Sequence, residues 1–494
     1  MTIRIQDLME ESGVKFGTSG ARGLAVQMTD RVCYTYTRGF LQYLASVGNI
    51  TSGSAVAIAG DFRPSTDQIM AAVGKAVSDC GYTPVNCGKI PSPAVALKGI
   101  SDRIPAIMVT GSHIPADRNG IKFNTPDGEI LKEDEAGIRE QEVNLDSGLF
   151  NEDGNFLSPH PLPATDDSAK KAYIARYLDF FPKDALAGLS IGVYQHSAVG
   201  RDVLVDIYQG LGATVTPLER SETFIPVDTE AIRSEDVALA KEWCSTGKYF
   251  TIVSTDGDSD RPLISDENGT WLRGDVAGIL SARYLGADSV STPVSCNSAA
   301  EKSGYFVKVH RTRIGSPFVI ASMNEAVTAG ALMAIGYEAN GGFLTNSPLR
   351  RYDKTLAALP TRDAVILHLA IILLARQDGC TISELCASLP QRFTASDRIQ
   401  EFPQENSRAI LDTFSTGNAD TDRTAIEKSF GALCGKVASI DRTDGVRITF
   451  DNEEVVHLRP SGNAPEFRCY TEAATNDRAV ELNRQCMDQL RKMI

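Results

Sequence analysis

The chain has 494 residues, of which 42% are hydrophobic and 23% charged, and its formal net charge is -14. One hydrophobic core rarely serves so long a chain, so we expect roughly three or four domains. The composition excludes collagen-like, disordered and coiled-coil proteins. The acidic balance argues against broad electrostatic binding to nucleic acid or to an anionic membrane surface.

Residues 1–13 lack the basic and apolar regions of a signal peptide. The longest apolar stretch, residues 364–375, is shorter than the roughly 20 residues that span a bilayer, so we predict a buried core helix there. Ten cysteines are scattered along the chain without a CxxC pair. This usage predicts reduced, buried thiols in a cytoplasmic protein.

Three segments repeat the order strand, helix, glycine turn, strand. The first covers residues 55–88, the second residues 189–217, and the third residues 305–337. In the third segment we take residues 305–309 as the first strand and residues 334–337 as the second. A period above about 100 residues indicates duplicated α/β domains instead of a solenoid.

The rest of the chain suggests where these domains end. Residues 144–167 are rich in Asp, Asn, Gly and Pro, which is typical of a linker. Near the C-terminus, alternating strands at 438–442, 446–450 and 454–458 predict an antiparallel meander, followed by a polar loop and a helix from Asp477. We therefore predict three tandem α/β domains with mixed sheets and a C-terminal α+β domain, with the ranges 1–160, 161–265, 266–393 and 394–494.

The first segment that suggests chemistry is Val109–Phe123, where an apolar strand ends in Gly111 and Ser112. His113 follows directly, and Lys122 lies ten residues after the serine. This combination suits a serine that accepts a phosphoryl group beside a proton carrier. An ordinary polar turn is the alternative. A hydrolase triad is disfavoured, because the Gly-x-Ser-x-Gly pattern is missing.

The second segment carries Asp256, Asp258 and Asp260 at alternate positions after a predicted strand. Three such carboxylates can converge on one hard cation, and oxygen ligands favour Mg²⁺ or Ca²⁺ over zinc. An EF-hand loop fails, because Arg261 stands where that loop needs glycine. A solvated acidic turn remains an alternative, as does an enzyme that forms an aspartyl phosphate on Asp256.

Two further loops carry polar groups that suit a sugar phosphate. The loop at residues 336–343 bears Glu338 and Asn340, a carboxylate and an amide that can hold vicinal hydroxyls. The loop at residues 458–468 offers a guanidinium, a hydroxyl, a glycine backbone and an amide, which together can hold a phosphate dianion. Those four residues are Arg459, Ser461, Gly462 and Asn463. Plain turns between strands are the alternatives.

In this order, the four segments resemble the α-D-phosphohexomutase family, which includes phosphoglucomutases, phosphomannomutases and phosphoglucosamine mutases. The likeness covers essentially the whole chain, and its further matches are Phe16–Gly23, Asp61–Arg63, Pro91–Pro93 and Gly269–Asp275. The resemblance implies four domains around a central cleft, each giving it one loop. It also implies a serine that is phosphorylated in the resting enzyme and hands its phosphoryl group to the substrate.

Carried over residue by residue, the resemblance makes Ser112 the phosphorylated serine and, with Asp256, Asp258 and Asp260, a ligand of Mg²⁺. Lys122 and Arg22 match residues of proton transfer and charge stabilisation, and Arg261 matches the arginine of the metal loop. Glu338 and Asn340 fall on the loop that holds the sugar hydroxyls. The residues expected to grip the phosphate that does not react are Arg459, Ser461, Gly462 and Asn463.

Some positions depart from the family pattern. Ile114 replaces a polar Asn, Asn340 replaces Ser, and Gly342 stands where His is common. His310 and Arg313 could supply a missing proton carrier or cation, or they could be structural.

The loop variants most resemble the phosphomannomutase branch. The expected reaction interconverts mannose 6-phosphate and mannose 1-phosphate through a hexose 1,6-bisphosphate, which also serves as activator. Alternatives are a phosphoglucomutase, a dual-specificity enzyme or a non-catalytic sugar-phosphate binding protein. We expect a hexose phosphate as the substrate, no nucleic-acid or membrane partner, and a monomer or homodimer.

Overall fold

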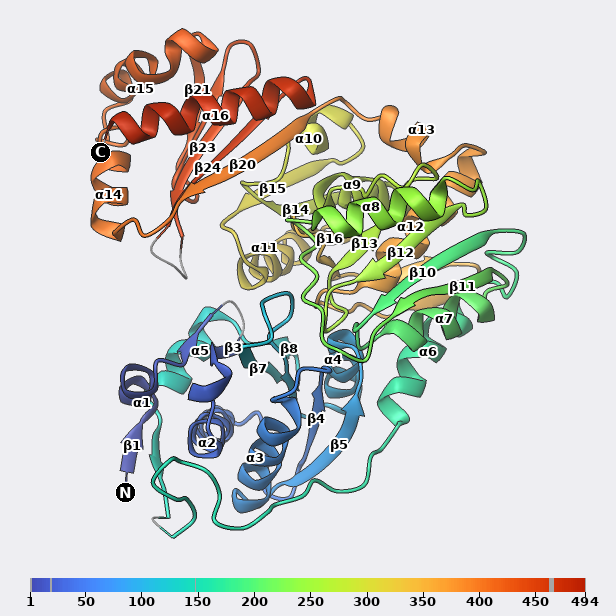
Figure 1. The fold of residues 1–494 in the computed structure, drawn as a ribbon, viewed down its shortest axis with the longest axis vertical. Coiled ribbons are helices and arrows are strands. Elements are labelled where there is room, and N and C mark those ends of the chain that lie inside the picture. Colours follow the sequence, from blue (N-terminus) through green and yellow to red (C-terminus); the bar gives the residue numbers. More distant parts are fainter. Residues whose placement is uncertain (1, 18–19, 147, 462–465, 494) are drawn as a thin grey trace.

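The structure is a computed structural model that describes residues 2–17, 20–146, 148–461 and 466–493. The chain builds four large sheets, which follow one another along an arc from the blue N-terminal part to the red C-terminal part (Figure 1). Among the described residues, none of the helices is both long and apolar enough to cross a membrane.

The first sheet lies in the N-terminal part and has seven strands. These are β2 (Lys15–Phe16), β3 (Gly20–Leu24), β4 (Ala55–Gly60), β5 (Thr83–Lys89), β6 (Ala106–Val109), β7 (Arg118–Thr125) and β8 (Gly128–Glu129). Their order is β2-β3-β7-β6-β4-β5, with β8 beside β7. β4 is parallel to β5 and β6, and β7 is antiparallel to its neighbours, so the sheet is mixed.

Helices and a short ribbon surround this first sheet. The helices are α1 (Ile5–Ser12), the short 3-10 helix η1 (Ala25–Gln27), α2 (Asp30–Ser46), α3 (Thr66–Asp79), α4 (Ser92–Asp102) and α5 (Lys132–Arg139). The ribbon pairs β1 (Thr2–Arg4) with β9 (Glu142–Asn144). The Thr29 side chain caps α2 by accepting a hydrogen bond from the Val32 N–H, which satisfies one of the free donors at the helix start.

The second and third sheets share one topology. The second contains β10 (Ser190–His196), β11 (Thr214–Arg220), β12 (Thr251–Thr255) and β13 (Pro262–Ile264), in the order β11-β10-β12-β13. The third contains β14 (Ser289–Pro293), β15 (Lys308–Thr312), β16 (Ala334–Tyr337) and β17 (Phe343–Thr345), in the order β15-β14-β16-β17. In both, three strands are parallel and the last is antiparallel, as in β5-β4-β6-β7 of the first sheet. The prediction of three related α/β layers is therefore confirmed.

The prediction for the third repeat missed one strand, because the two predicted strands correspond to β15 and β16 and leave out β14. The central strand is β14, and both β15 and β16 are parallel neighbours of it instead of neighbours of each other. The sequence Ser-Val-Ser-Thr-Pro of β14 has only one clearly apolar residue, so it looks like a polar turn although the strand is fully buried. The repeat thus begins near residue 289 and not near residue 305.

The helices of this middle part close the space around the two sheets. They are α6 (Ser168–Phe180), α7 (Arg201–Gly210), α8 (Ser234–Cys244), α9 (Gly274–Leu285), α10 (Ala299–Ser303), α11 (Ser316–Thr328), α12 (Ala364–Asp378) and α13 (Ile382–Ala387). A small ribbon joins β18 (Leu349–Arg351) to β19 (Lys354–Leu356). Residues 364–375 of α12 are all buried, which confirms the predicted core helix.

The segment predicted as a linker, residues 144–167, has little regular secondary structure, although its first residue, Asn144, ends β9. From residue 145 to residue 167, outside position 147, the chain contains no helix or strand beyond an isolated bridge between Phe150 and Phe156.

The fourth sheet is antiparallel and has the order β20-β24-β23-β22-β21. Its strands are β20 (Phe393–Ile399), β21 (Val437–Asp441), β22 (Val446–Phe450), β23 (Val455–Pro460) and β24 (Phe467–Ala473), with the helices α14 (Gln404–Asp412), α15 (Ala419–Cys434) and α16 (Asn476–Lys492). The predicted meander and closing helix are confirmed. The stretch expected to be a polar loop contains β24, which pairs with both β23 and β20.

The apolar cores divide the molecule unequally. One continuous cluster of buried residues runs from Ala57 to Leu389 and joins elements of the first three sheets. The fourth sheet has a separate core, drawn only from Phe402–Leu490. Because its core is separate, the fourth body depends on polar contacts for much of its attachment to the third.

All ten cysteines lie among the described residues and form no disulfide; seven are buried and three are partly buried.

Candidate active site

Ser112 lies in the loop between β6 and β7, at the end of a central strand of the first sheet. Its side chain is fully buried, and its backbone has a positive φ of 57°. Arg63 holds this loop by donating to the carbonyl oxygens of Ser112 at 2.8 Å, Ile114 at 2.5 Å and Pro115 at 2.6 Å. Asp61 pairs with Arg63 at 3.1 Å, and both side chains are buried. The Asp61–Arg63 motif thus fastens the serine loop, a role the sequence did not reveal.

The serine loop meets the acidic loop between β12 and β13. Ser112 Oγ donates a hydrogen bond to Asp256 Oδ2 at 2.5 Å. The loops approach so closely that a Cβ on Gly257 would lie 2.8 Å from the Ser112 carbonyl oxygen. Ser92, at the start of α4, also donates through Oγ to Asp258 Oδ2 at 2.7 Å. The first and second sheets are therefore joined at this site through buried polar contacts.

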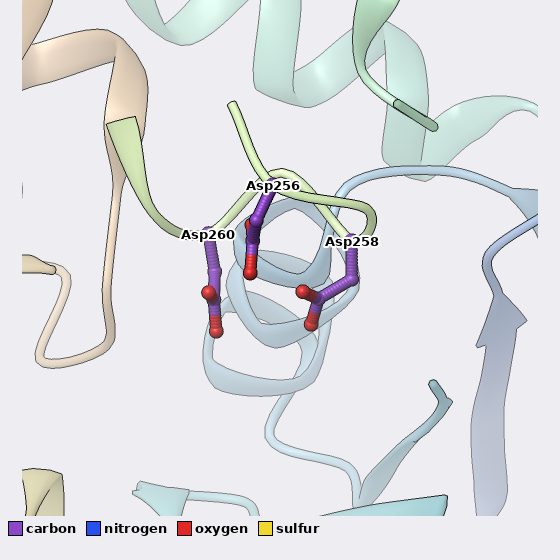
Figure 2. A group of neighbouring side chains, drawn as sticks. All are labelled: Asp256, Asp258 and Asp260. Carbon is purple, nitrogen blue, oxygen red and sulfur yellow. The ribbon is translucent and has the colours of Figure 1, made fainter. Parts of the chain in front are cut away.

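Three carboxylates converge beside the serine. Figure 2 shows Asp256, Asp258 and Asp260 projecting to the same side of their loop, and one oxygen from each lies within 4.8 Å of the others. Their exposed fractions are 0%, 0% and 2%, so the alternative of a solvated acidic turn is wrong. The flanking elements are strands, which agrees with the rejection of an EF-hand.

Lys122 on β7 reaches into this cluster from the first sheet. Its Nζ lies 2.6 Å from Asp258 Oδ2 and 2.7 Å from Asp260 Oδ2. Burial lowers the pKa of Lys122, but the two carboxylates more than offset this and raise the pKa above its ordinary value. Burial would raise the pKa of Asp258, yet Lys122 and Ser92 bring it below its ordinary value.

The residues present fit a hard divalent cation. Burial, together with the charges of Asp258 and Asp260, raises the pKa of Asp256 well above its ordinary value, so the three carboxylates repel one another although Lys122, Arg261 and Arg362 lie beside them. Within the described residues, Asp258 Oδ1 and Asp260 Oδ1 are buried and accept no hydrogen bond. Oxygen atoms with no donor, in an all-carboxylate set, match the ligand preference of Mg²⁺ or Ca²⁺.

Arg261 and His113 border the cluster on its open side. Arg261 Nη1 donates to His113 Nδ1 at 2.8 Å, and His113 Nε2 lies 4.0 Å from Asp228 Oδ2. Burial and the neighbouring Arg261 charge lower the pKa of His113 to about 3, so the imidazole is neutral at pH 7. Arg22 lies near the same charges, and burial with the field of Arg261 lowers its pKa to about 10.

The loop after β16 reaches the carboxylates through a residue that sequence reasoning missed. Arg362 Nε donates to Glu338 Oε1 at 2.7 Å, and its Nη1 lies 3.8 Å from Asp260 Oδ2. A Cβ on Gly342 would lie 2.5 Å from Arg362 Cδ, so this glycine makes room for the buried arginine. Asn340 Oδ1 accepts the Gly342 N–H at 2.9 Å. No local pattern marks Arg362, because its partners lie 24 and about 100 residues away.

The fourth sheet brings its own polar loop. Arg459 is the last residue but one of β23 and donates from Nε to Asp444 Oδ1 at 3.2 Å. The Ser461 N–H donates to the Glu466 carbonyl oxygen at 2.8 Å. Gly462 and Asn463 lie outside the described residues. A cavity of ≈ 350 Å³ lies between the loops that carry His113 and Arg261 and this sheet, and residues of β20 and β24 line its other side.

His310 and Arg313, noted in the sequence, stand apart from the carboxylate cluster on or after β15. Arg313 Nε donates to the Thr443 carbonyl oxygen at 3.2 Å, which ties the third body to the fourth. Burial and the Lys308 charge lower the pKa of His310. Arg313 therefore has a structural contact of its own.

Comparisons with known proteins agree with this arrangement. The family models for phosphoglucomutase/phosphomannomutase α/β/α domain I and domain III match residues 13–147 and 273–393. The chain is 43% identical to a phosphomannomutase from Salmonella muenchen over 96% of this chain and 95% of that protein. It is 42% identical to a phosphomannomutase from Sinorhizobium fredii, over 95% and 97%.

Among solved structures, the fold is similar to that of a putative phosphomannomutase from Thermus thermophilus, with a TM-score of 0.72 at 20% identity over 97% and 98% of the two chains. The chain therefore belongs to the phosphoglucomutase/phosphomannomutase family, which confirms the resemblance seen in the sequence. It is accordingly an enzyme of the mutase class, an isomerase.

Proposed function

We propose that the chain is a Mg²⁺-dependent phosphomannomutase that interconverts mannose 6-phosphate and mannose 1-phosphate through a phosphoserine at Ser112. The observation that carries the proposal is the 2.5 Å contact of Ser112 Oγ with Asp256, inside a buried cluster of three carboxylates. A serine hydroxyl beside a cation site suits phosphoryl transfer, which needs charge neutralisation and alignment more than covalent help from the protein. The names of the two relatives favour mannose phosphates.

In this proposal Ser112, Asp256, Asp258 and Asp260 hold the metal, which when bound neutralises negative charge on the phosphoryl oxygens. Lys122 stays protonated, since its pKa is raised, and it supplies positive charge and a proton at Nζ. Arg22 and Arg261 stabilise the charge that spreads over the phosphoryl group.

The sequence position of His113 after Ser112 suggested a proton carrier, but in this proposal its main role is to orient Arg261. His113 is neutral and accepts from Arg261, so it orients that guanidinium and presents an Nε2–H to the cavity. A proton transfer by His113 would run through this neutral form.

The two remaining loops bind the substrate. Glu338 and Asn340 hold sugar hydroxyls, with Arg362 fixing the Glu338 carboxylate by a 2.7 Å contact. Arg459, Ser461, Gly462 and Asn463 grip the phosphate that does not react. A hexose 1,6-bisphosphate forms when Ser112 donates its phosphoryl group, and it turns over so that its other phosphate returns to Ser112. The same bisphosphate, supplied in catalytic amount, activates unphosphorylated enzyme.

The proposed domains are 1–160, 161–265, 266–393 and 394–494. The first three large sheets lie inside the first three ranges, and the fourth begins at Phe393, the last residue of the third. A fourth domain with its own core suits an enzyme that must grip either end of the bisphosphate and exclude water while it reacts.

The proposal is tested by measuring conversion of mannose 1-phosphate, glucose 1-phosphate and glucosamine 1-phosphate, alone and in competition, with a catalytic amount of the corresponding bisphosphate. Mannose 1-phosphate should give the highest kcat/KM. A preference for glucose 1-phosphate would instead support the phosphoglucomutase alternative, since the two sugars differ only at C2. Ligand binding without turnover of any sugar would support a non-catalytic binding protein.

Phosphopeptide mapping after incubation with the bisphosphate separates the two phosphoenzymes. An acid-stable phosphate on Ser112 is expected. An acid-labile acyl phosphate on Asp256 would contradict the serine assignment and support the aspartyl-phosphate alternative.

A further inference from the structure

The turn between β21 and β22 places a carboxylate against the proposed phosphate-binding arginine. Asp444 Oδ1 accepts from Arg459 Nε at 3.2 Å, and the two side chains are only 17% and 12% exposed. Gly445 allows this approach: its φ is 75°, and a Cβ there would lie 2.7 Å from Arg459 Cβ. His457 Nε2 donates to the Asp444 carbonyl oxygen at 2.6 Å. The turn is therefore packed directly onto the strand that carries Arg459.

The second oxygen of the same carboxylate reaches the third body. Asp444 Oδ2 accepts the Ile314 N–H at 3.1 Å, and the neighbouring Thr443 carbonyl accepts from Arg313 Nε at 3.2 Å. Residues 313–314 follow β15 directly. The Asp444 side chain thus bridges the arginine of the fourth sheet and the backbone of the third body. The apolar cores of these two bodies are separate.

Charge balance gives the Asp444 contact a second purpose. Arg459 lies directly opposite Arg468 in the β23–β24 ladder, and like charges in this position repel. Each guanidinium has its own carboxylate, because Glu466 pairs with Arg468 at 3.0 Å. Within the described residues the Arg459 side chain donates only its Nε–H, to Asp444, which leaves the four N–H groups on the two Nη atoms as a fork for a phosphate.

We propose that Asp444 is a positioning residue for the mutase reaction. It aims the Arg459 guanidinium, and through its contact with Ile314 it links that aim to the docking of the fourth body on the third. The grip on the phosphate is thereby coupled to domain closure. The inference rests on the proposed function, in which Arg459 grips the phosphate that does not react.

The first test is Asp444→Asn, assayed in the full-length enzyme with mannose 1-phosphate. An asparagine has one acceptor oxygen, so it can serve Arg459 or Ile314 but not both. We expect KM to rise about tenfold while kcat changes by less than about threefold, because the loss concerns binding to the phosphate. The matched control is Asp451→Asn, an exposed aspartate in the turn between β22 and β23, at the opposite end of β22 from Asp444, which should leave both parameters unchanged.

The second test asks whether Asp444 acts through Arg459. KM and inhibition by inorganic phosphate are compared in Arg459→Ala and in the double variant Arg459→Ala/Asp444→Asn. If Asp444 only positions Arg459, its replacement has no further effect once the guanidinium is gone. Two results would overturn this inference but leave the proposed function intact. One is that the KM effects of the two changes multiply in the double variant. The other is an unchanged KM in Asp444→Asn together with a raised KM in Arg459→Ala.

An Arg459→Ala variant with wild-type KM and phosphate inhibition would instead remove the proposed phosphate site, and this inference with it. Thermal melting checks that each variant is folded. Should Asp444→Asn fail to fold, Arg313→Ala tests the same bridge from the third body. It should raise KM about twofold to threefold, as expected for one exposed contact, and no rise in KM would contradict the coupling to closure.

Discussion

The proposed reaction centre at Ser112 and the proposed phosphate-binding end of the fourth sheet are built in opposite ways. Around Ser112 the contacts cross between the first and second sheets and are almost completely buried, and the two sheets share one apolar core. Around Arg459 the side chains are partly exposed, and the body that carries them has its own core. In the proposed mechanism the chemistry therefore belongs to a tightly packed part, and the grip on the phosphate belongs to a body with a separate core, which suits movement.

This difference suits a reaction whose intermediate must turn over. A serine that receives and returns a phosphoryl group needs an unchanging position relative to its cation and to Lys122. A guanidinium that holds first one phosphate and then the other needs to release its ligand between steps. Changes in the first region should therefore reduce kcat, and changes in the second should mainly raise KM.

The largest effect should come from Ser112→Ala, which removes the proposed phosphoryl acceptor. We expect kcat to fall by at least about 10³-fold, with no phosphate incorporated from the labelled bisphosphate. A matched control is Ser259→Ala, another buried serine with a similar positive φ of 60° in the adjoining loop. It should lower the melting temperature and keep most turnover. Equal losses of kcat in the two variants would show that packing, not the hydroxyl of Ser112, is responsible.

The next largest effect should follow removal of Mg²⁺ by a chelator. Turnover should fall by about 10²-fold or more, and adding Mg²⁺ at 100 times its Kd should stabilise the folded protein by about 2.7 kcal/mol. Calorimetric unfolding with and without Mg²⁺ measures this stabilisation. It should vanish in Asp258→Asn, and an undiminished shift in that variant would place the metal elsewhere.

On the other side of the comparison, Arg459→Ala should raise KM for the hexose phosphate about 10-fold to 100-fold. The reason is the loss of a charge-assisted hydrogen bond, which is worth about 1.5–3 kcal/mol. Steady-state kinetics on mannose 1-phosphate provide the measurement. The exposed Arg484→Ala on α16 is the control for a change of net charge. A fall in kcat without a rise in KM would mean that the two regions do not divide the work as described.

The last effect concerns the pH dependence of the stability of the fourth body and should change turnover least. Burial lowers the pKa of His457 from 6.5 to about 4, so the folded protein keeps this imidazole neutral while the unfolded chain binds a proton below pH 6.5. The contribution of neutral His457 to the free energy of unfolding is complete above pH 6.5. As the pH falls toward 4, the free energy of unfolding decreases by up to about 3 kcal/mol.

Thermal unfolding followed between pH 7 and pH 4 should show this slope in the transition of the fourth body. The slope should be weaker in His457→Gln, whose side chain does not titrate. The comparison uses slopes, because the substitution also changes packing against Tyr470. An identical slope in the variant would mean that other groups cause the acid sensitivity.

Local patterns predicted those parts of the site that one short segment supplies. Alternate carboxylates after a strand predicted the cluster at Asp256, and a Gly-Ser turn after a strand predicted a phosphoryl-accepting serine at the end of that strand. The structure brings the two together although they are 144 residues apart. That meeting was expected only from the resemblance to a family, since no spacing within either loop requires it.

The residues that sequence reasoning missed act across large separations. Arg362 and Asp444 stand in segments without a motif, and their partners come from other elements. Strand β14 was missed for a related reason. Its Ser and Thr side chains are buried because other layers cover them, and its sequence has no apolar pattern that predicts a buried strand. Burial imposed by tertiary structure leaves little trace in a local sequence pattern.

The positive φ of Ser112 also restricts which amino acid could serve as the proposed phosphoryl acceptor at this position. A left-handed backbone tolerates serine at a modest cost but strongly disfavours a β-branched residue, whose branches crowd the neighbouring carbonyl. Threonine bears the same hydroxyl, yet it would have to change the loop that Arg63 fastens. The backbone conformation at this position therefore favours serine over threonine, independently of the reactivity of the hydroxyl group.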